Sequence, residues 1–392
     1  MAKLFVVSEL FYPEQTATAF VMTKIVNKLS EKYDDIEVIK GTAVYDKNAN
    51  PHSGYFIEKN VKLTVVKSID AEKNSIVARS ARFILLSLSM FKTLLTKVKP
   101  GDKVLIVTNP APIVILMYML KKIKKIQLVI LVHDVFPENT IPGGILKSKH
   151  SIIYKILLPL FNRAYAAADK LIVVGRDMKE VLHSKIRKSN KHPNISVIEN
   201  WSEDESVYPK PYSNEKLVFQ FAGNLGRVQG LIDLIKVIRE VKNDYLEFHF
   251  VGDGAVKNEM IEFASANNMN NVVFKDAYRR EEQTDVLNAC DIAIVTLSEG
   301  MFGLGVPSKS YNVLAAGKPI LYIGDQESEI DLMVRENKIG FNFSKAEDLV
   351  TFFNEITPAS KSQFQNMGKI ARQLAETRYS QKYILEKYKA EI

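Results

Sequence analysis

The sequence has very little cysteine and no long apolar run, and both shortages limit what the protein can be. Cys290 is the single cysteine among 392 residues, so the chain cannot form an internal disulfide or a cysteine cluster for a metal. The longest uninterrupted apolar run, Ala111–Leu120, has ten residues, whereas a membrane-spanning helix needs roughly 20. We therefore expect a soluble or peripheral protein of a reducing compartment.

Signals for export and for the commonest nucleotide-binding folds are also missing. Residues 1–7 run directly into a strand pattern, without the charged and apolar regions of a signal peptide. No Walker lysine motif occurs, and the absence of the G-x-G-x-x-G glycines disfavours a Rossmann dehydrogenase. The 46% hydrophobic share is that of an ordinary globular protein, and the length suits two domains of about 200 residues each.

Positive charge is concentrated in the first half of the chain. The net charge, counted as Lys and Arg residues minus Asp and Glu residues, is +14 for residues 1–200 and −6 for residues 201–392. Together these give the +8 of the whole chain. The excess is densest in residues 79–103, 121–125 and 185–191. Two interpretations stay open: a solvated basic face, or a dock for an anionic surface, either phospholipid or nucleic acid. Nucleic acid is disfavoured, because no RNA-binding motif, recognition helix or zinc finger accompanies the charge.

The stretch Ser80–Lys92 bears on this choice. It predicts a helix with a wide apolar face and basic ends, which is typical of helices that lie in a membrane interface. A core helix of the first domain explains the same pattern equally well.

Strand and helix patterns alternate along the whole chain, which predicts parallel sheets covered by helices on both faces. The first series predicts strands at Lys3–Ser8, Glu37–Gly41, Val61–Lys67, Lys103–Thr108, Gln127–Val132, Lys170–Val174 and Val197–Glu199, with helices at Thr16–Lys32 and Ser75–Lys97. The second series predicts strands at Leu217–Ala222, Glu247–Gly252, Asn271–Lys275, Ile292–Thr296 and Pro319–Ile323, with helices beginning near Gly230, Ala255, Arg280, Ser308 and Glu327. We expect two doubly wound α/β domains, Rossmann-like, that face each other across a cleft.

The expected domain limits follow from these series. The first domain covers residues 1–200, residues 201–215 form a linker with two prolines and little periodicity, and the second domain covers 216–376. An amphipathic helix at Tyr379–Glu391 lies in the remaining segment, residues 377–392.

Two glycine-rich loops follow predicted strands of the second domain. In the first, Gly223, Asn224, Gly226 and Arg227 lie between a strand and a helix, where glycines let a backbone approach a diphosphate. A purely structural turn explains this loop equally well.

The second loop, Ser298–Lys309, is the stronger indication. It contains Gly303, ends at the potential N-cap Ser308, and places Lys309 in the first helical turn. A lysine there is disfavoured by the helix dipole, so its presence indicates an anion nearby, unless its ammonium is simply solvated.

These loops resemble the donor-binding element of glycosyltransferase family 4, and matching segments occur in order along nearly the whole chain. They are Phe11–Glu14, Thr16–Ala19, His133–Glu138, Val173–Met178, Ile198–Trp201, Gly223–Gly226, Gly252–Gly254, Ala289–Asp291, Val306–Lys309 and Leu314–Pro319. The chain is most similar to bacterial transferases of O-antigen and capsule assembly typified by N-acetyl-L-fucosamine transferase.

The resemblance implies a GT-B fold, no metal or other cofactor, and transfer with retention of anomeric configuration. The donor, a UDP-sugar as first choice, would bind the second domain, and the C-terminal helix would cross back to the first. The acceptor would be an undecaprenyl-diphosphate-linked saccharide bound by the first domain. We therefore expect a cytoplasmic enzyme, peripheral at the inner face of the membrane and attached to its anionic surface, with no nucleic-acid partner.

The chain departs from the family at three positions. Asn224 and Gln229 stand where many members have an Arg and a Lys for the diphosphate, and Asn312 stands where many have a ribose-binding Glu. Arg227 and Lys309 are the available replacements, and uridine diphosphate remains the first choice of nucleotide.

Other candidates follow from the resemblance and from position. His133, at the end of a buried strand, would hydrogen-bond near the transferred sugar as a neutral imidazole. Glu299 either contacts sugar hydroxyls or is simply a surface residue of its loop, and Asp253 either contributes to donor binding or caps the next helix. Glu14 is a weaker acceptor-binding candidate, whereas Trp201 and Cys290 are expected to serve packing.

Two other functions remain as alternatives. A sugar-nucleotide epimerase of related two-domain fold would use the donor without an acceptor. A non-catalytic subunit of a transferase complex is compatible with the missing Arg, Lys and Glu.

Overall fold

The computed structural model describes residues 3–14, 16–42, 55–67 and 76–392, and it divides into two compact units. Unit 1 comprises residues 1–198 and 385–392, and unit 2 comprises residues 199–384. Ser75, the expected start of a long helix, and Met1 and Ala2 lie outside the described residues. Both units are α/β domains with parallel sheets, as the alternating pattern predicts.

Within its described residues, unit 1 has a seven-stranded sheet in the order β3-β2-β1-β4-β5-β6-β7. Its strands are β1 (Leu4–Ser8), β2 (Ile36–Gly41), β3 (Val61–Val66), β4 (Lys103–Val107), β5 (Gln127–Val132), β6 (Lys170–Val173) and β7 (Asn194–Val197). The order reverses between β1 and β4, and such a reversal is where ligands bind in open α/β sheets, beyond the carboxyl ends of the strands.

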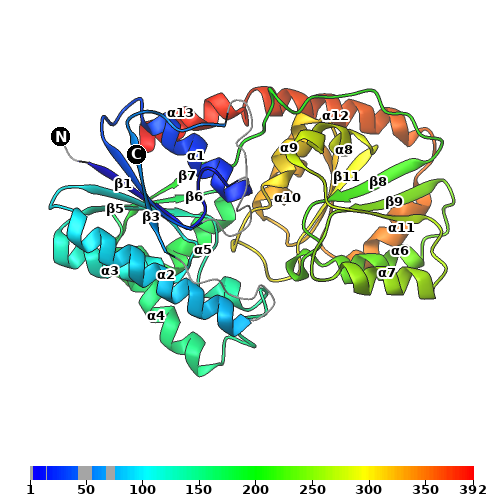
Figure 1. Cartoon of the computed structure of the whole chain (residues 1–392). Coiled ribbons are helices and arrows are strands. Elements are labelled where there is room, and N and C mark those ends of the chain that lie inside the picture. Colours follow the sequence, from blue (N-terminus) through cyan, green and yellow to red (C-terminus); the bar gives the residue numbers. More distant parts are fainter. Residues whose placement is uncertain (1–2, 15, 43–54, 68–75) are drawn as a thin grey trace. The chain divides into compact units, whose positions relative to one another are not determined.

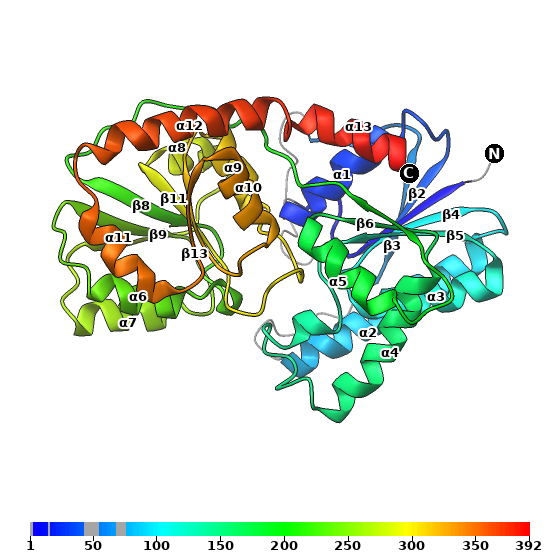
Figure 2. The same ribbon diagram turned by 180° about the vertical axis from the view of Figure 1, so that it is seen from behind.

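Helices cover both faces of this sheet. Figures 1 and 2 show α1 (Ala17–Leu29) and α13 (Gln381–Glu391) on one face, and α2 (Ile76–Lys97), α3 (Pro112–Lys124) and α4 (Ile152–Ala167) on the other. The short 3-10 helix η1 (Glu138–Thr140) precedes α4, and α5 (Arg176–Ile186) follows β6.

The C-terminal helix ends on unit 1. Lys170 Nζ donates to the Glu391 carboxylate at 2.7 Å, and the Tyr33 hydroxyl donates to the Ile392 carbonyl at 2.6 Å. The carboxylate of Glu391 also accepts from Ser196 Oγ at 2.7 Å. These bonds attach the last turn to the first sheet, so the crossing of the C-terminal helix is confirmed.

Unit 2, every residue of which is described, has a six-stranded sheet in the order β10-β9-β8-β11-β12-β13. Its strands are β8 (Leu217–Ala222), β9 (Leu246–Val251), β10 (Val272–Lys275), β11 (Ile292–Thr296), β12 (Ile320–Ile323) and β13 (Gly340–Phe343). Its helices are η2 (Arg227–Gln229), α6 (Leu231–Arg239), α7 (Lys257–Ala266), η3 (Arg280–Glu282), α8 (Gln283–Asn288), α9 (Lys309–Ala315), α10 (Glu329–Asn337), η4 (Ala346–Asp348), α11 (Leu349–Glu355) and α12 (Ser360–Glu376). The order reverses between β8 and β11, as in unit 1.

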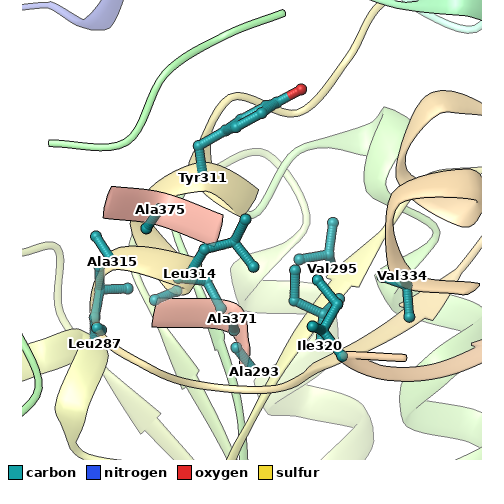
Figure 3. Packing of buried hydrophobic residues seen from close by; sticks show 14 of the residues in the cluster. Leu287, Ala293, Val295, Tyr311, Leu314, Ala315, Ile320, Val334, Ala371 and Ala375 are labelled. Atoms are coloured by element: carbon teal, nitrogen blue, oxygen red, sulfur yellow. The ribbon is translucent and has the colours of Figure 1, made fainter. Parts of the chain in front are cut away.

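Close packing fixes the position of α9. Figure 3 shows Leu314 of α9 near Ala371 and Ala375 of α12, and all three are fully buried. A Cβ on Gly368 would lie 2.2 Å from the carbonyl oxygen of Gly317, so a side chain at residue 368 would push the end of α9 away from α12. The core therefore holds the C-terminal part of α9 against α12.

Most predicted elements are confirmed to within one or two residues, and the differences lie at sheet edges and near the end of the chain. The edge strand β7 lies at Asn194–Val197 and shares only Val197 with the predicted Val197–Glu199. The edge strand β13, with the sequence GFNF, and helices α11 and α12 were not predicted. Edge strands are only partly buried, so their sequences lack the continuous apolar run that marks the central strands.

Residues 201–215, expected to be a linker, lie along unit 2. The Ser202 hydroxyl donates to the Ala375 carbonyl at 2.8 Å, and the Lys210 amide donates to Asn288 Oδ1 at 2.7 Å. The segment is thus hydrogen-bonded to the second domain rather than free of it.

Candidate functional site

The two loops that leave β8 and β11 are joined to each other. The Ser298 amide donates to the Val228 carbonyl at 2.9 Å, and the Ser298 hydroxyl donates to the Arg227 carbonyl at 3.3 Å. The two glycine-rich segments singled out from the sequence therefore form one structure at the strand-order reversal of unit 2. This is the position at which an open α/β sheet binds its ligand.

The loop after β9 packs backbone to backbone against the loop after β8. The Leu225 amide donates to the Asp253 carbonyl at 2.8 Å. Gly252 has φ +143°, and a Cβ there would lie 2.0 Å from the carbonyl oxygen of Gly223. Asp253 Oδ1 accepts from the amide of Gly254 at 2.8 Å, so the carboxylate orders its own loop and does not cap α7.

The side chain of Lys309 reaches from one loop to the other. It runs from the start of α9 to the carboxyl end of β8, where Nζ lies 3.1 Å from the centroid of the Phe221 ring. A Cβ on Gly223 would lie 3.5 Å from Lys309 Cδ and 3.9 Å from Nζ. The turn at Gly223 and the start of α9, which the sequence pattern assigned to one ligand, are therefore adjacent.

The ammonium of Lys309 has no counter-charge. Among the described residues, no oxygen accepts a hydrogen bond from Nζ, and burial lowers the pKa of the amine well below its ordinary value. A desolvated cation without an anionic partner is unfavourable, and an anionic ligand beside it would relieve that cost. This arrangement fits the binding of a phosphate group.

The other candidate residues of the two loops are Arg227, Glu299, Asn224 and Ser308. Arg227 is exposed at the start of η2, and Glu299 is exposed in the loop after β11. Asn224 lies over Gly226, since a Cβ on that glycine would be 2.8 Å from Asn224 Nδ2. Ser308 precedes α9, but its hydroxyl makes no capping hydrogen bond to the helix.

Asp325, which the sequence analysis missed, orders the second loop around Gly303. Its carboxylate accepts from the Phe302 amide at 2.7 Å and from the Gly300 amide at 3.4 Å. Gly303 itself is buried, with φ +66°. Asp325 follows β12 at the carboxyl edge of the sheet, so its position relative to the strand is the signal that could have identified it.

Asn312, the expected ribose-binding residue, is engaged within unit 2. Its Oδ1 accepts from the Glu203 amide at 2.9 Å, and its Nδ2 donates to the Glu203 carboxylate at 3.0 Å. The same carboxylate forms an ion pair with Arg280. A ribose contact by Asn312 would therefore have to replace Glu203.

In unit 1, His133 follows β5, and its amide is bound by Thr108, the residue directly after the neighbouring strand β4. Thr108 Oγ1 accepts from the amides of His133 and Asp134 at 3.2 and 3.1 Å. His133 Nε2 is buried without a hydrogen-bond partner among the described residues, and burial lowers the pKa of the imidazole to about 4. Burial raises the pKa of Asp134 to about 6, although its carboxylate accepts from Asn139 at 2.8 Å. The imidazole is therefore neutral at physiological pH.

Buried contacts position the segment after His133. Lys185 of α5 pairs with the Glu138 carboxylate at 2.5 Å, and both side chains are largely covered. The Phe136 amide donates to the hydroxyl of Tyr165 at 3.2 Å. The segment is thus attached to α4 and α5 and presents His133 from a fixed backbone.

The loop after β1 carries a second buried polar group. Glu9 forms a buried ion pair with Arg82, and Lys40 Nζ donates to the Tyr12 carbonyl at 2.6 Å. Glu14 is buried and its carbonyl accepts from the Tyr55 hydroxyl at 2.8 Å. Its expected contact with an acceptor would require this loop to open.

Trp201 and Cys290 are both buried, in agreement with their expected packing roles. Within the described part of the chain, no three His, Cys, Asp or Glu side chains lie close enough together to hold a metal ion. A metal-independent reaction stays a prediction.

Comparison with known proteins identifies the family. A family profile described as "Glycosyl transferases group 1" matches residues 216–356, which contain both glycine-rich loops and Lys309. The curated protein "Probable glycosyltransferase WbjE" of Pseudomonas aeruginosa is 34% identical over 400 aligned positions, covering 100% of this chain and 97% of that protein.

Solved structures share the fold at low sequence identity. HepE from Anabaena, crystallised with UDP, has a TM-score of 0.67 and 13% identity, covering 100% of this chain and 99% of its own. WaaG, described as a glycosyltransferase involved in lipopolysaccharide biosynthesis, has a TM-score of 0.67 and 13% identity, with 99% of each chain covered. Together with the full-length match to WbjE, these results show that the chain belongs to the group 1 glycosyl transferases and has the GT-B fold.

Proposed function

We propose that this glycosyltransferase takes its sugar from a nucleoside diphosphate donor, with UDP as the first choice, and that unit 2 binds the diphosphate. The observation that carries the proposal is the Lys309 ammonium, desolvated, without a counter-charge and adjacent to Gly223. A diphosphate at this point would supply the missing negative charge. The crystal structures of HepE with UDP and with UDP and glucose support the choice of nucleotide.

The chemistry assigned to these residues is stabilisation of a leaving group. Breaking the bond between the anomeric carbon and the diphosphate places negative charge on the departing phosphate oxygen. Lys309 and Arg227 would stabilise it, and one charge-assisted hydrogen bond contributes roughly 1.5–3 kcal/mol. In this proposal Glu299 contacts sugar hydroxyls, and neutral His133 hydrogen-bonds near the transferred sugar.

The proposal includes retention of the anomeric configuration. The acceptor hydroxyl would attack the anomeric carbon on the same face from which the phosphate departs. The departing phosphate oxygen would then take the proton of the acceptor hydroxyl, so no separate protein base is required. NMR of the product decides this point: retention of the donor's anomeric configuration supports it, and inversion contradicts it.

We further propose that the acceptor is a saccharide linked to a lipid diphosphate, in the assembly of a bacterial surface polysaccharide. The transferred sugar would be of the N-acetylated deoxyhexosamine class. The net charge of +14 over residues 1–200 supports an anionic, membrane-embedded acceptor. The role of WaaG in lipopolysaccharide biosynthesis supports the polysaccharide context.

Thermal unfolding with a panel of nucleotides tests the donor proposal. A ligand at 100 times its dissociation constant stabilises the folded state by about 2.7 kcal/mol. We expect UDP and UDP-sugars to raise the unfolding temperature and AMP to leave it unchanged. No response to any nucleoside diphosphate would contradict the proposal, and conversion of the donor without an acceptor would identify an epimerase.

A further inference from the structure

Helices α2, α3 and α4 contain no aspartate or glutamate. Residues 73–168, which include all three helices, contain 15 Lys and Arg and only three acidic residues, Asp102, Asp134 and Glu138. Each acid is used internally: Asp102 accepts from the Lys3 and Lys99 amides, Asp134 accepts from Asn139, and Glu138 pairs with Lys185. Carboxylates from outside this range pair with Arg82, Lys97 and Lys121. Among the described residues, no carboxylate pairs with the exposed Lys122, Lys125, Lys147, Lys149 or Lys155, so these cations are left unbalanced.

The start of α4 exposes large apolar side chains beside these cations. Ile152 is 76% exposed, and Ile153 and Ile156 are each 58% exposed. The opposite side of the helix packs inward through Tyr154 and Phe161. A helix that is apolar on both sides is normally buried on both sides, so its outer side lacks a partner here.

The neighbouring helices continue this apolar exposure. Ile84, Leu85 and Leu88 of α2 are exposed, while Leu86 and Met90 of the same helix are buried. On α3, which packs against both α2 and α4, Met119 and Ile123 are exposed. Figures 1 and 2 show the three helices together on one face of the first sheet. We call the exposed residues of these helices the α2–α4 surface: Ile84, Leu85, Leu88, Met119, Ile123, Ile152, Ile153 and Ile156.

Exposed lysines surround the α2–α4 surface and indicate an anionic partner. Lys147, Lys149 and Lys155 are exposed at and just before the start of α4, and Lys122 and Lys125 are exposed at the end of α3. Apolar side chains that enter acyl chains, surrounded by lysines at headgroup level, are the pattern of an interfacial membrane-binding helix. None of the described helices is both long and apolar enough to cross the bilayer.

We propose that the α2–α4 surface docks on an anionic phospholipid leaflet, with Ile152, Ile153 and Ile156 inserted among acyl chains and Lys147, Lys149 and Lys155 on the headgroups. The docking element is the start of α4, which the sequence analysis did not single out, together with the outer side of the predicted helix Ser80–Lys92. The proposal deepens the proposed function, on which its biological role rests, because a lipid-linked acceptor lies in the same leaflet.

Sedimentation with vesicles tests the docking. The protein is mixed at low salt with vesicles of phosphatidylcholine alone or of phosphatidylcholine and phosphatidylglycerol, and the bound fraction gives a partition coefficient. The insertion variant combines Ile152→Ser, Ile153→Ser and Ile156→Ser. Its control is Ile370→Ser in unit 2, where the isoleucine is also exposed, at 41%. The charge variant Lys155→Glu is matched by Lys242→Glu, an exposed lysine of unit 2 with the same change in net charge.

The proposal predicts binding to the anionic vesicles and little binding to phosphatidylcholine alone. The triple variant should bind at least a hundredfold more weakly, since burying one isoleucine contributes roughly tenfold or more. Lys155→Glu should bind about thirtyfold more weakly, because each positive charge near an anionic leaflet contributes roughly fivefold. Ile370→Ser and Lys242→Glu should bind like the wild type.

Several outcomes would overturn the docking proposal. These are absence of wild-type binding to the anionic vesicles, equal binding to both vesicle types, and equal losses in the unit 1 variants and their unit 2 controls. Binding to duplex DNA without vesicle binding would overturn it as well. The response of the same variants to UDP separates the two proposals: vesicle binding without any nucleotide response leaves the docking standing and removes the donor proposal.

Discussion

Replacing Lys309 by methionine should make the free protein more stable and the donor site weaker. Methionine keeps most of the apolar length of the side chain over Phe221 but removes an ammonium that has no counter-charge. Removing the cation–π interaction costs about 2 kcal/mol at a desolvated site, whereas the desolvation penalty that disappears with the charge is several kcal/mol for a buried ion. The difference between these two effects predicts a net gain of roughly 1 kcal/mol, or about 2–4 °C in Tm.

The pH dependence of this gain has a defined sign. Because the pKa of Lys309 is lowered in the folded state, the unfolded chain binds the proton more tightly. The cost is therefore fully present below the lowered pKa and disappears as the pH rises towards 10.5, the ordinary value for lysine. The stability advantage of Lys309→Met should shrink over the same alkaline range.

The response to UDP should change in the opposite direction. Loss of one charge-assisted hydrogen bond, roughly 1.5–3 kcal/mol, weakens binding about ten- to a hundredfold, so the UDP-induced rise in Tm should largely disappear. Lys257→Met is the matched control, because Lys257 also begins its helix but pairs with Asp276 at 3.0 Å. Differential scanning fluorimetry with and without UDP measures both effects. A less stable Lys309→Met protein, or one with an unchanged UDP response, would refute the reasoning.

Three further predictions concern other parts of the two units. Between pH 6 and 4, Asp134→Asn should lose stability on acidification by about 1.4 kcal/mol per pH unit relative to the wild type. In the variant, unfolding protonates His133, whose pKa is about 4 when folded and 6.5 ordinarily, whereas in the wild type the proton that Asp134 releases on unfolding offsets this uptake. His133→Asn should show the opposite slope, because folded Asp134, with a pKa of about 6, holds a proton that the unfolded chain releases; urea unfolding at several pH values measures both, and parallel curves would contradict the assigned pKa values. Asp325→Asn should lower the stability of unit 2 by about 1–2 kcal/mol, since it removes charge from the acceptor of the Phe302 amide; an unchanged Tm would show that the loop is held by other contacts. Gly252→Ala should cost about 2 kcal/mol or more, because its Cβ would meet the Gly223 carbonyl at 2.0 Å, and circular dichroism during heating would detect the destabilisation.

The central strands were predictable because they are buried on both faces of the sheet. Such strands have continuous apolar sequences. The predicted limits of Gln127–Val132, Leu217–Ala222 and Ile292–Thr296 agree with those of β5, β8 and β11. The half-buried edge strand Gly340–Phe343 has no such run. Its pairing is set by its neighbour β12, and one short segment of sequence does not contain that information.

Local sequence identified the loops of the candidate site but not all of the hydrogen bonds made inside them. Glycines and a lysine at a helix start mark Gly223 and Lys309 without knowledge of the fold, and the structure brings the two together. The partner of Asn312 is Glu203, more than a hundred residues away, so the engagement of its amide could not be read from local sequence. Asp325 was missed for the same reason, because its carboxylate acts on a loop that follows a different strand.

The central claim is that a diphosphate lies between the turn at Gly223–Arg227 and Lys309, and a crystal structure of the protein with bound UDP tests it most directly. We predict a phosphate oxygen within hydrogen-bonding distance, about 2.7–3.0 Å, of Lys309 Nζ, with the diphosphate beside Gly223. UDP bound elsewhere, or bound in unit 2 with Lys309 still directed at Phe221 and away from the phosphates, would contradict it.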